Sequence, residues 1–133
     1  MEPLRLFPIV ALVSIPTVMF GGYALLRFLT RGEGLSEFKL TYFRAGHAHA
    51  GVLLILALVY FDYLERTDLG DRMRWSLGVA LVVGILAQSG GFFLHMAVGA
   101  PGRRSIGTTV TIVGAAILAV AILVLAYGLA VAG

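Results

Sequence analysis

Residues 45–60 read Ala-Gly-His-Ala-His-Ala-Gly-Val-Leu-Leu-Ile-Leu-Ala-Leu-Val-Tyr. Two of the three histidines of the chain therefore enter a long apolar run, and every other residue from 45 to 51 is small. Small side chains allow another helix or a planar cofactor to approach the backbone closely. A polar side chain at membrane depth is by default a candidate for function. The stretch predicts a membrane-spanning helix that carries a candidate site.

The composition extends this prediction to the whole chain. Of 133 residues, 59% are hydrophobic and 13% are charged, and the mean hydropathy is +0.96. Four apolar runs each reach the roughly 18–20 residues that cross a bilayer. We predict an all-α integral membrane four-helix bundle, a single domain over 1–133, with both termini on one side. The predicted helices cover about 6–29, 45–64, 75–98 and 106–131.

The charges and the absence of cysteine narrow the partners and cofactors. Without cysteine there are no disulfides, thiolate haem ligands, iron–sulfur clusters or covalently attached c-type haem. The net charge is +3, and the arginines lie near helix ends, where they suit lipid headgroups, so we expect no nucleic-acid partner. Six Lys/Arg flank the first and third loops and four lie on the other side, which favours cytoplasmic odd loops. We expect a multi-pass protein of a bacterial inner membrane.

Three local patterns give further structural predictions. Pro16 should kink the first helix, where Ser14 and Thr17 can satisfy freed backbone groups. The aromatic second half of the polar stretch 30–44 should lie along the membrane interface, ahead of the second helix. Small residues recur at four-residue spacing in the last helix, and we expect such stripes to mediate helix packing and homo-oligomers. They are Gly107, Thr111 and Ala115.

The three histidines are the candidate ligands. His49 and His95 should lie at one level, about 5–6 Å below the same interface, when residues are counted along antiparallel helices. His47 and His49 are about 200° apart around their helix and cannot readily share one metal ion. Zinc needs three or four convergent ligands, and Asp62 and Glu65 are a bilayer away. Haem needs one or two imidazoles, although the histidines could equally form hydrogen bonds between helices.

The third helix offers a second group of candidates. Gln88, Gly91 and His95 share one stripe, and Ser89 and Phe93 share an adjacent one. Gln88 and Ser89 at mid-membrane should face protein, either in a site or as hydrogen-bonding groups between helices. The Gly90-Gly91 pair is either a close helix contact or the floor of a pocket.

At these two segments the chain resembles the styrene oxide isomerases, small four-helix membrane enzymes related in architecture to the hydroxylaminobenzene mutases. The second helix of that family opens with an Arg-Ala-His-Ser-Gly type motif, which residues 46–51 match with His49 at the position of the haem-ligating histidine. The third helix of the family carries a Ser-Asn-Val-Gly-Phe-Tyr-Leu pattern, which residues 88–94 match. The resemblance covers about fifty residues.

The resemblance implies a homotrimer with haem b between subunits and a ferric iron that polarises an epoxide oxygen. A small apolar epoxide would then rearrange to a carbonyl compound. Several positions depart from the family pattern. The family's tyrosine falls on Phe93, its two asparagines fall on Ser89 and Ile55, and His95 has no family counterpart. The match with the family therefore supports haem binding more than it supports epoxide isomerisation.

We therefore predict a haem-binding membrane protein, with isomerisation as the activity that the resemblance implies. His49 is the predicted axial ligand to the iron. The other cofactor-binding candidates are His95, His47 and Gly91, and the positions matching the family's catalytic groups are Ser89 and Phe93. The alternatives are a non-enzymatic haem protein with two axial histidines, for redox or sensing, and a cofactor-free bundle that is structural or binds a small molecule.

Overall fold

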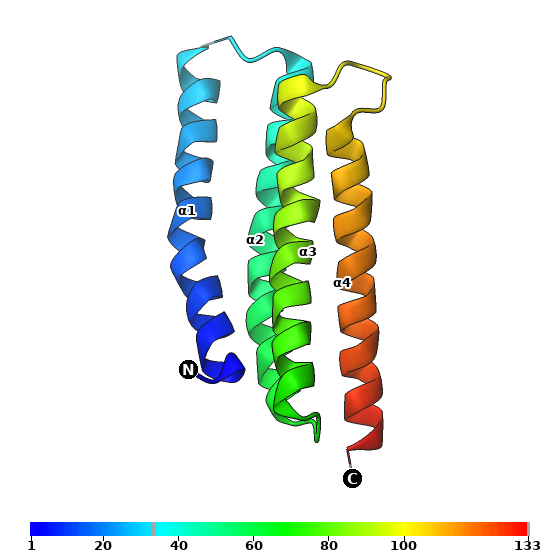
Figure 1. Cartoon of the computed structure of the whole chain (residues 1–133). Coiled ribbons are helices and arrows are strands. Elements are labelled where there is room, and N and C mark those ends of the chain that lie inside the picture. Colours follow the sequence, from blue (N-terminus) through cyan, green and yellow to red (C-terminus); the bar gives the residue numbers. More distant parts are fainter. Residues whose placement is uncertain (33, 133) are drawn as a thin grey trace.

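The computed structural model describes residues 1–32 and 34–132, and this part of the chain forms four helices without strands. The helices are α1 (Pro3–Arg31), α2 (Glu37–Glu65), α3 (Asp71–Val98) and α4 (Ile106–Val131). Each is long and apolar enough to cross a membrane. The prediction of an all-α membrane four-helix bundle is confirmed, and the chain termini lie at one end of it (Figure 1).

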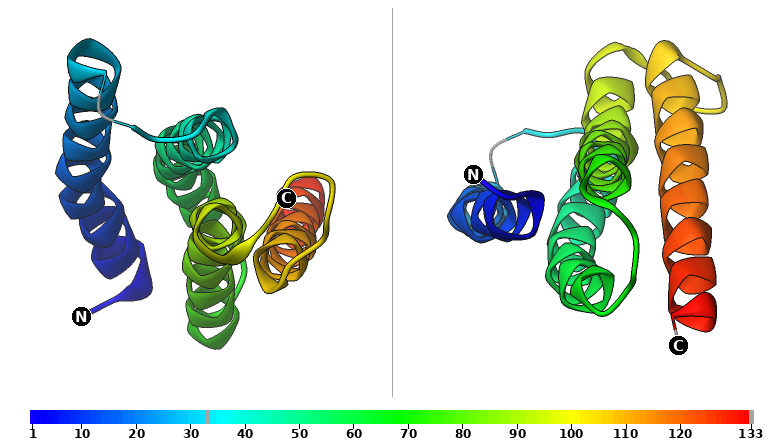
Figure 2. Two further views of the ribbon diagram at one scale, coloured as in Figure 1. Left: turned by 90° about the horizontal axis from the view of Figure 1, so that it is seen from above. Right: turned by 60° about the horizontal axis from the view of Figure 1, so that its bottom comes forward.

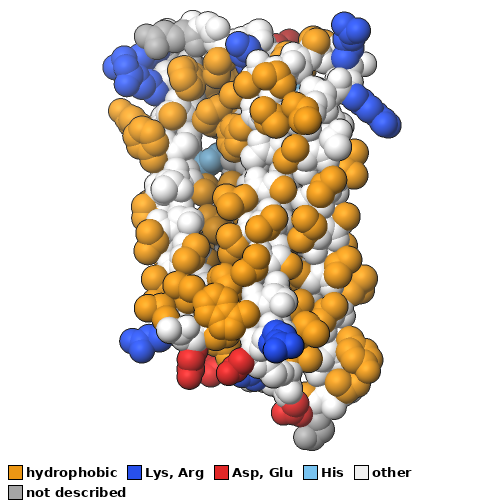
Figure 3. Space-filling view, viewed as in Figure 1, with side chains coloured by type: hydrophobic (Ala, Val, Ile, Leu, Met, Phe, Trp, Pro, Cys, Tyr) orange, Lys and Arg blue, Asp and Glu red, His pale blue; other side chains and the backbone are white. Residues whose placement is uncertain are grey.

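The helices are not arranged as a closed square. α2 and α3 form a central pair, and α1 and α4 lie on opposite flanks of that pair (Figure 2). Lys, Arg, Asp and Glu gather at the two ends of the molecule, and a wide band of apolar side chains separates them (Figure 3). This distribution suits a hydrocarbon layer between two polar surfaces.

The prediction of a separate interfacial segment before α2 is wrong, because α2 starts at Glu37 and continues into the membrane-depth stretch. Ser36 caps the helix by accepting a hydrogen bond from the Lys39 N–H, and Glu37 favours the first turn. Phe38 and Tyr42 therefore lie on the helix, where their rings contact His95 of α3. Because α2 is continuous here, Phe38 and Tyr42 pack against α3 instead of lying along the lipid surface.

α1 continues through Pro8 and Pro16 as one helix from Pro3 to Arg31. Pro16 faces outward, and the nearby hydroxyls donate to carbonyls other than the one that Pro16 leaves without its N–H. Ser14 donates to the Val10 carbonyl at 2.7 Å, and Thr17 donates to the Ser14 carbonyl at 2.6 Å.

α3 and α4 pack through two pairs of glycines spaced seven residues apart on each helix. A Cβ on Gly91 would lie 2.7 Å from the Gly107 carbonyl oxygen, and one on Gly84 would lie 3.3 Å from the Gly114 carbonyl oxygen. A separation of seven residues returns to nearly the same helical face, so both pairs lie along one seam. The small-residue stripe that we expected to mediate oligomers is thus partly used within the chain, and a homo-oligomer stays a prediction.

Candidate functional site

The three histidines lie toward the end of the bundle that carries the α1–α2 and α3–α4 loops, and they occupy three different environments. His47 and His49 are on α2 and His95 is on α3. His49 contacts α3, His47 contacts α1, and His95 contacts the first turn of α4. Figure 3 shows a histidine side chain in the furrow beside α1. The structure does not bring the three rings together at one point.

His49 presents one ring nitrogen to its surroundings. Its Nδ1 lies 2.8 Å from the Ala45 carbonyl oxygen, which can only accept, so Nδ1 carries the proton. In the neutral imidazole, Nε2 then holds a lone pair, and the described residues give it no hydrogen-bond partner. A backbone carbonyl on the other nitrogen is the usual way in which proteins fix a metal-binding histidine in its tautomer.

Aromatic rings adjoin His49. Phe92 of α3 lies 4.6 Å from the imidazole, centroid to centroid, at an interplanar angle of 36°. Tyr42 lies 6.5 Å from Phe92 and is seven residues before His49 on nearly the same face of α2. The His49 side chain is half-buried, and Ala45, one turn before it, is small. The imidazole therefore stands beside flat apolar groups with its Nε2 side accessible.

His47 packs against a glycine pair of α1. Its Nδ1 lies 3.3 Å from where a Cβ on Gly21 would be, and its Nε2 lies 3.2 Å from the same position on Gly22. Both ring nitrogens thus face the α1 backbone, because the missing side chains leave room for the ring. This places His47 on a different side of α2 from His49, as their angular separation requires.

His95 is a buried link between α3 and α4. The residue is 4% exposed, and its Nδ1 lies 2.7 Å from the Ser105 hydroxyl and 3.3 Å from the Thr108 hydroxyl. Ser105 is the N-cap of α4 and accepts from the Gly107 N–H, so its own proton can go to His95. Hydroxyls thus engage Nδ1, and burial leaves no flat open surface beside the ring for a planar cofactor.

Gly91 is a close helix contact. In addition to the Gly107 carbonyl, a Cβ at this position would lie 2.6 Å from the Thr111 backbone nitrogen. The sequence left open whether this glycine forms a pocket floor or a helix contact, and the structure places it in the α3–α4 seam. Gly91 does not line the cavity between α1, α2 and α3 or the hollow beside His47.

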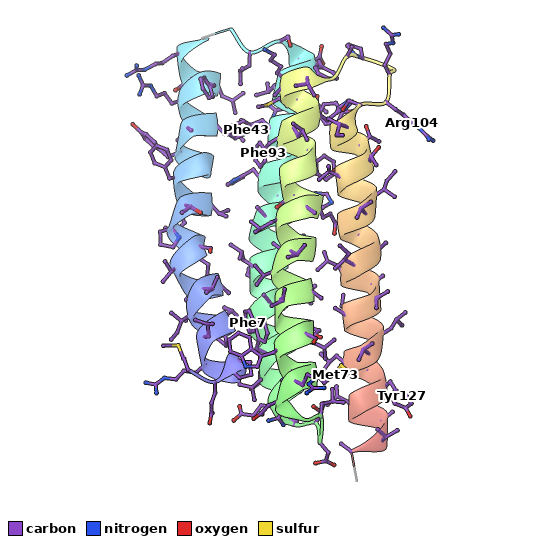
Figure 4. The ribbon with its side chains drawn as sticks, viewed as in Figure 1. Phe7, Phe43, Met73, Phe93, Arg104 and Tyr127 are labelled. Carbon is purple, nitrogen blue, oxygen red and sulfur yellow. The ribbon has the colours of Figure 1, made fainter. Side chains whose placement is uncertain are left out.

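Ser89 and Phe93 lie on the α1-facing side of α3. Ser89 is buried, donates to the Ile85 carbonyl at 2.6 Å, and lines a cavity of about 250 Å³ between α1, α2 and α3. The Phe93 ring contacts Gly46 and meets Phe43 edge-on, with centroids 5.5 Å apart; Figure 4 labels both rings near the upper end of α1. Neither residue is beside the His49 ring. Within a single chain, Ser89 and Phe93 therefore do not form one site with the candidate ligand.

A haem iron fits His49 better than a multi-ligand metal ion fits this chain. Among the described residues, no group of three His, Cys, Asp or Glu side chains converges. His49 has a free Nε2 lone pair, a fixed tautomer and adjoining aromatic surface, which meet the needs of a single axial ligand. His49 is half-buried beside Phe92, so a flat cofactor on this ring would need a further surface to enclose it.

Sequence reasoning missed two residues of this environment. Tyr42 was assigned to an interfacial segment, and Phe92 was treated only as part of a family pattern. The spacing of seven residues between Tyr42 and His49 was a usable signal once the helix was known to begin at Glu37. Phe92 had no such signal, because its contact with His49 depends on the rotation of α3 relative to α2.

Comparisons with known proteins add no relative. No protein-family model, no curated protein and no solved structure matches this chain.

Proposed function

We propose that this protein is a membrane haem protein in which His49 Nε2 is the axial ligand to the iron. The observation that carries the proposal is the state of the His49 ring. The Ala45 carbonyl holds the proton on Nδ1, and Nε2 of this half-buried ring beside Phe92 has no hydrogen-bond partner among the described residues. The alternatives on the same chain are weaker ligands, because hydroxyls engage the His95 ring, and His47, although it lines a hollow between α1 and α2, has no carbonyl among the described residues that fixes its tautomer.

A homo-oligomer, with a trimer as the expected form, supplies the rest of the pocket in this proposal. His49 is half-buried within its own chain, so this chain alone does not enclose its ring. A second chain against this face would bury the cofactor and the remaining side of the ring. The ratio of haem to protein and the mass of the detergent-solubilised particle test this part.

Ferric haem, when bound, supplies a Lewis-acidic iron. Among the described residues, no polar side chain forms a hydrogen bond with His49 that could serve epoxide chemistry. Phe93 has no hydroxyl, and the Ser89 hydroxyl is already bound to the Ile85 carbonyl on the cavity side of α3. The proposal therefore places haem binding first. Incubating the haem-loaded protein with styrene oxide and measuring aldehyde tests whether isomerisation accompanies it.

The decisive test is the visible spectrum of protein produced with ample haem. We expect a Soret band from wild-type protein at about one haem per site. His49→Ala should lose the band or shift it strongly, and added imidazole should restore it, because imidazole can occupy the vacated ligand position. His47→Ala is the matched control on the same helix and should keep the band.

His95→Ala separates one axial histidine from two. With one ligand the spectrum should change little, and with two it should shift from low-spin to high-spin. Wild-type protein without Soret absorbance would overturn the haem proposal. Loss of the band in His47→Ala with retention in His49→Ala would mean that the other histidine of the pair is the ligand.

A further inference from the structure

The middle of α1 stands away from α2 and α3 and leaves a cavity that the haem proposal does not use. The cavity measures about 250 Å³ and lies between the three helices. α1 is attached on either side of it. Near one end, Phe7 stacks on Phe61 of α2, and near the other, Phe28 meets Phe43 edge-on. Figure 4 labels Phe7 and Phe43 at these two levels.

The wall of the cavity is apolar in its chemistry. The described residues that line it include none with a charge, and the polar ones are Ser14, Thr17 and Ser89. Each of these hydroxyls donates to a carbonyl of its own helix, at 2.6–2.7 Å. Their protons are therefore not offered to a guest. A guest with polar or charged groups would lose its hydration without gaining partners.

The cavity opens toward the membrane. Val10 of α1 and Leu86 of α3 line it and are 38% and 66% exposed, and both lie within the apolar band of the molecule. A hydrocarbon molecule dissolved in the bilayer can therefore enter without crossing water. A dry cavity of about 150 Å³ lined by apolar side chains binds benzene in a soluble protein. The larger volume here matches two fused rings or a length of alkyl chain.

We propose that this cavity is a binding site for an uncharged hydrocarbon group, taken from the bilayer between α1, α2 and α3. The site is separate from the proposed haem ligand, since His49 does not line it. Two sources share this chemistry: a small aromatic or alicyclic molecule, and the acyl chain of a membrane lipid. Either molecule would fill the cavity and make dispersion contacts with the side chains that line it.

Equilibrium dialysis of radiolabelled naphthalene tests the proposal. The protein is dissolved in a steroid-based detergent whose rigid body is too broad for the cavity, and matched empty micelles on the other side remove the background. Wild-type protein should bind about one naphthalene per chain. The double variant Ala11→Leu/Ala50→Leu, which fills the cavity from α1 and α2, should weaken the binding at least tenfold.

The matched control is Ala116→Leu/Ala119→Leu, which adds the same atoms to the exposed surface of α4 and should bind as wild type. If the double cavity variant does not fold, Ala50→Trp replaces it. Equal uptake by wild-type protein and the filled variant overturns the proposal, as does no uptake by either.

Repeating the dialysis in lipid nanodiscs separates the two sources. Binding in detergent that disappears in nanodiscs assigns the cavity to a lipid acyl chain, and binding in both assigns it to a small molecule. The haem-free protein and His49→Ala should bind naphthalene as wild type does. A failure of the haem proposal would therefore leave this result unchanged.

Discussion

The two flanking helices are held to the central α2–α3 pair in different ways. α4 lies against α3 at four glycines, where backbone approaches backbone: Gly84, Gly91, Gly107 and Gly114. α1 touches the pair through larger side chains such as Phe7 and Phe28, and only 6% of the residues in its apolar stretch are buried, against 22% for α4. In a membrane, where apolar burial drives helix association little, close packing of small residues gives the firmer contact. The looser contact is the one that leaves a cavity.

The largest expected effect comes from breaking the α3–α4 seam. Gly91→Ala places a Cβ within 2.6 Å of the Thr111 backbone nitrogen, and backbone atoms cannot move aside without separating the helices. We expect the free energy of unfolding to fall by about 3 kcal/mol, the upper part of the range for overpacking. Titration with SDS in mixed micelles measures it.

The adjacent glycine provides the control for this change. Among the described residues nothing lies within 4 Å of a Cβ on Gly90. Gly90→Ala should therefore leave stability unchanged or raise it by about 0.5–1 kcal/mol, through the better helix propensity of alanine. Equal losses for both variants would show that the seam is not as tightly packed as the glycine pairs indicate.

A smaller loss in the free energy of unfolding is expected when the contact of Phe7 with α2 and α3 is removed. Phe7 stacks on Phe61 at 5.5 Å and meets Trp75 edge-on at 5.3 Å. Phe7→Ala should cost about 2 kcal/mol, since each aromatic pair contributes roughly 0.5–1.5 kcal/mol. Phe20→Ala on the same helix is the control, because Phe20 is 69% exposed, and should cost little. The same SDS titration compares them.

The hydrogen-bonded link between α3 and α4 should contribute less than the glycine seam. His95→Ala leaves the Ser105 and Thr108 hydroxyls without their imidazole partner and should lower the free energy of unfolding by about 1–2 kcal/mol. His95→Asn, which keeps a polar group near Ser105, should recover part of this loss in the same titration. A loss as large as that of Gly91→Ala would show that the hydrogen bonds of His95 stabilise the α3–α4 contact as much as the glycine seam does.

The smallest effect is expected at the loose contact. Ala50→Leu extends a side chain into the cavity beside α1 and should raise the free energy of unfolding by about 0.5–1 kcal/mol, as cavity filling commonly does. Ala119→Leu on the exposed face of α4 should not change it. Thermal unfolding in one detergent can resolve the difference. A destabilised Ala50→Leu variant would indicate that α1 lies closer to α2 than the cavity implies.

The candidate ligand shows how far sequence reasoning extends into the site. The spacing of His47 and His49 was enough to predict that the two rings face different sides of one helix. It was not enough to say what each ring contacts. That depends on Gly21 and Gly22, which receive His47, and on Phe92, which lies beside His49. These residues come from other helices, and their positions depend on how each helix is rotated about its axis.

The sequence by itself determined the number of helices, their approximate spans and their membrane character. These follow from the length of apolar runs relative to a bilayer, a property of local composition. The tertiary structure alone decided that Tyr42 lies against His95, that Gly91 belongs to a helix seam, and that a cavity lies beside α1. Apolar residues surround each helix, so hydropathy does not mark which face meets protein and which meets lipid. That choice depends on the fit of small and large side chains between helices, which exists only once the helices are together.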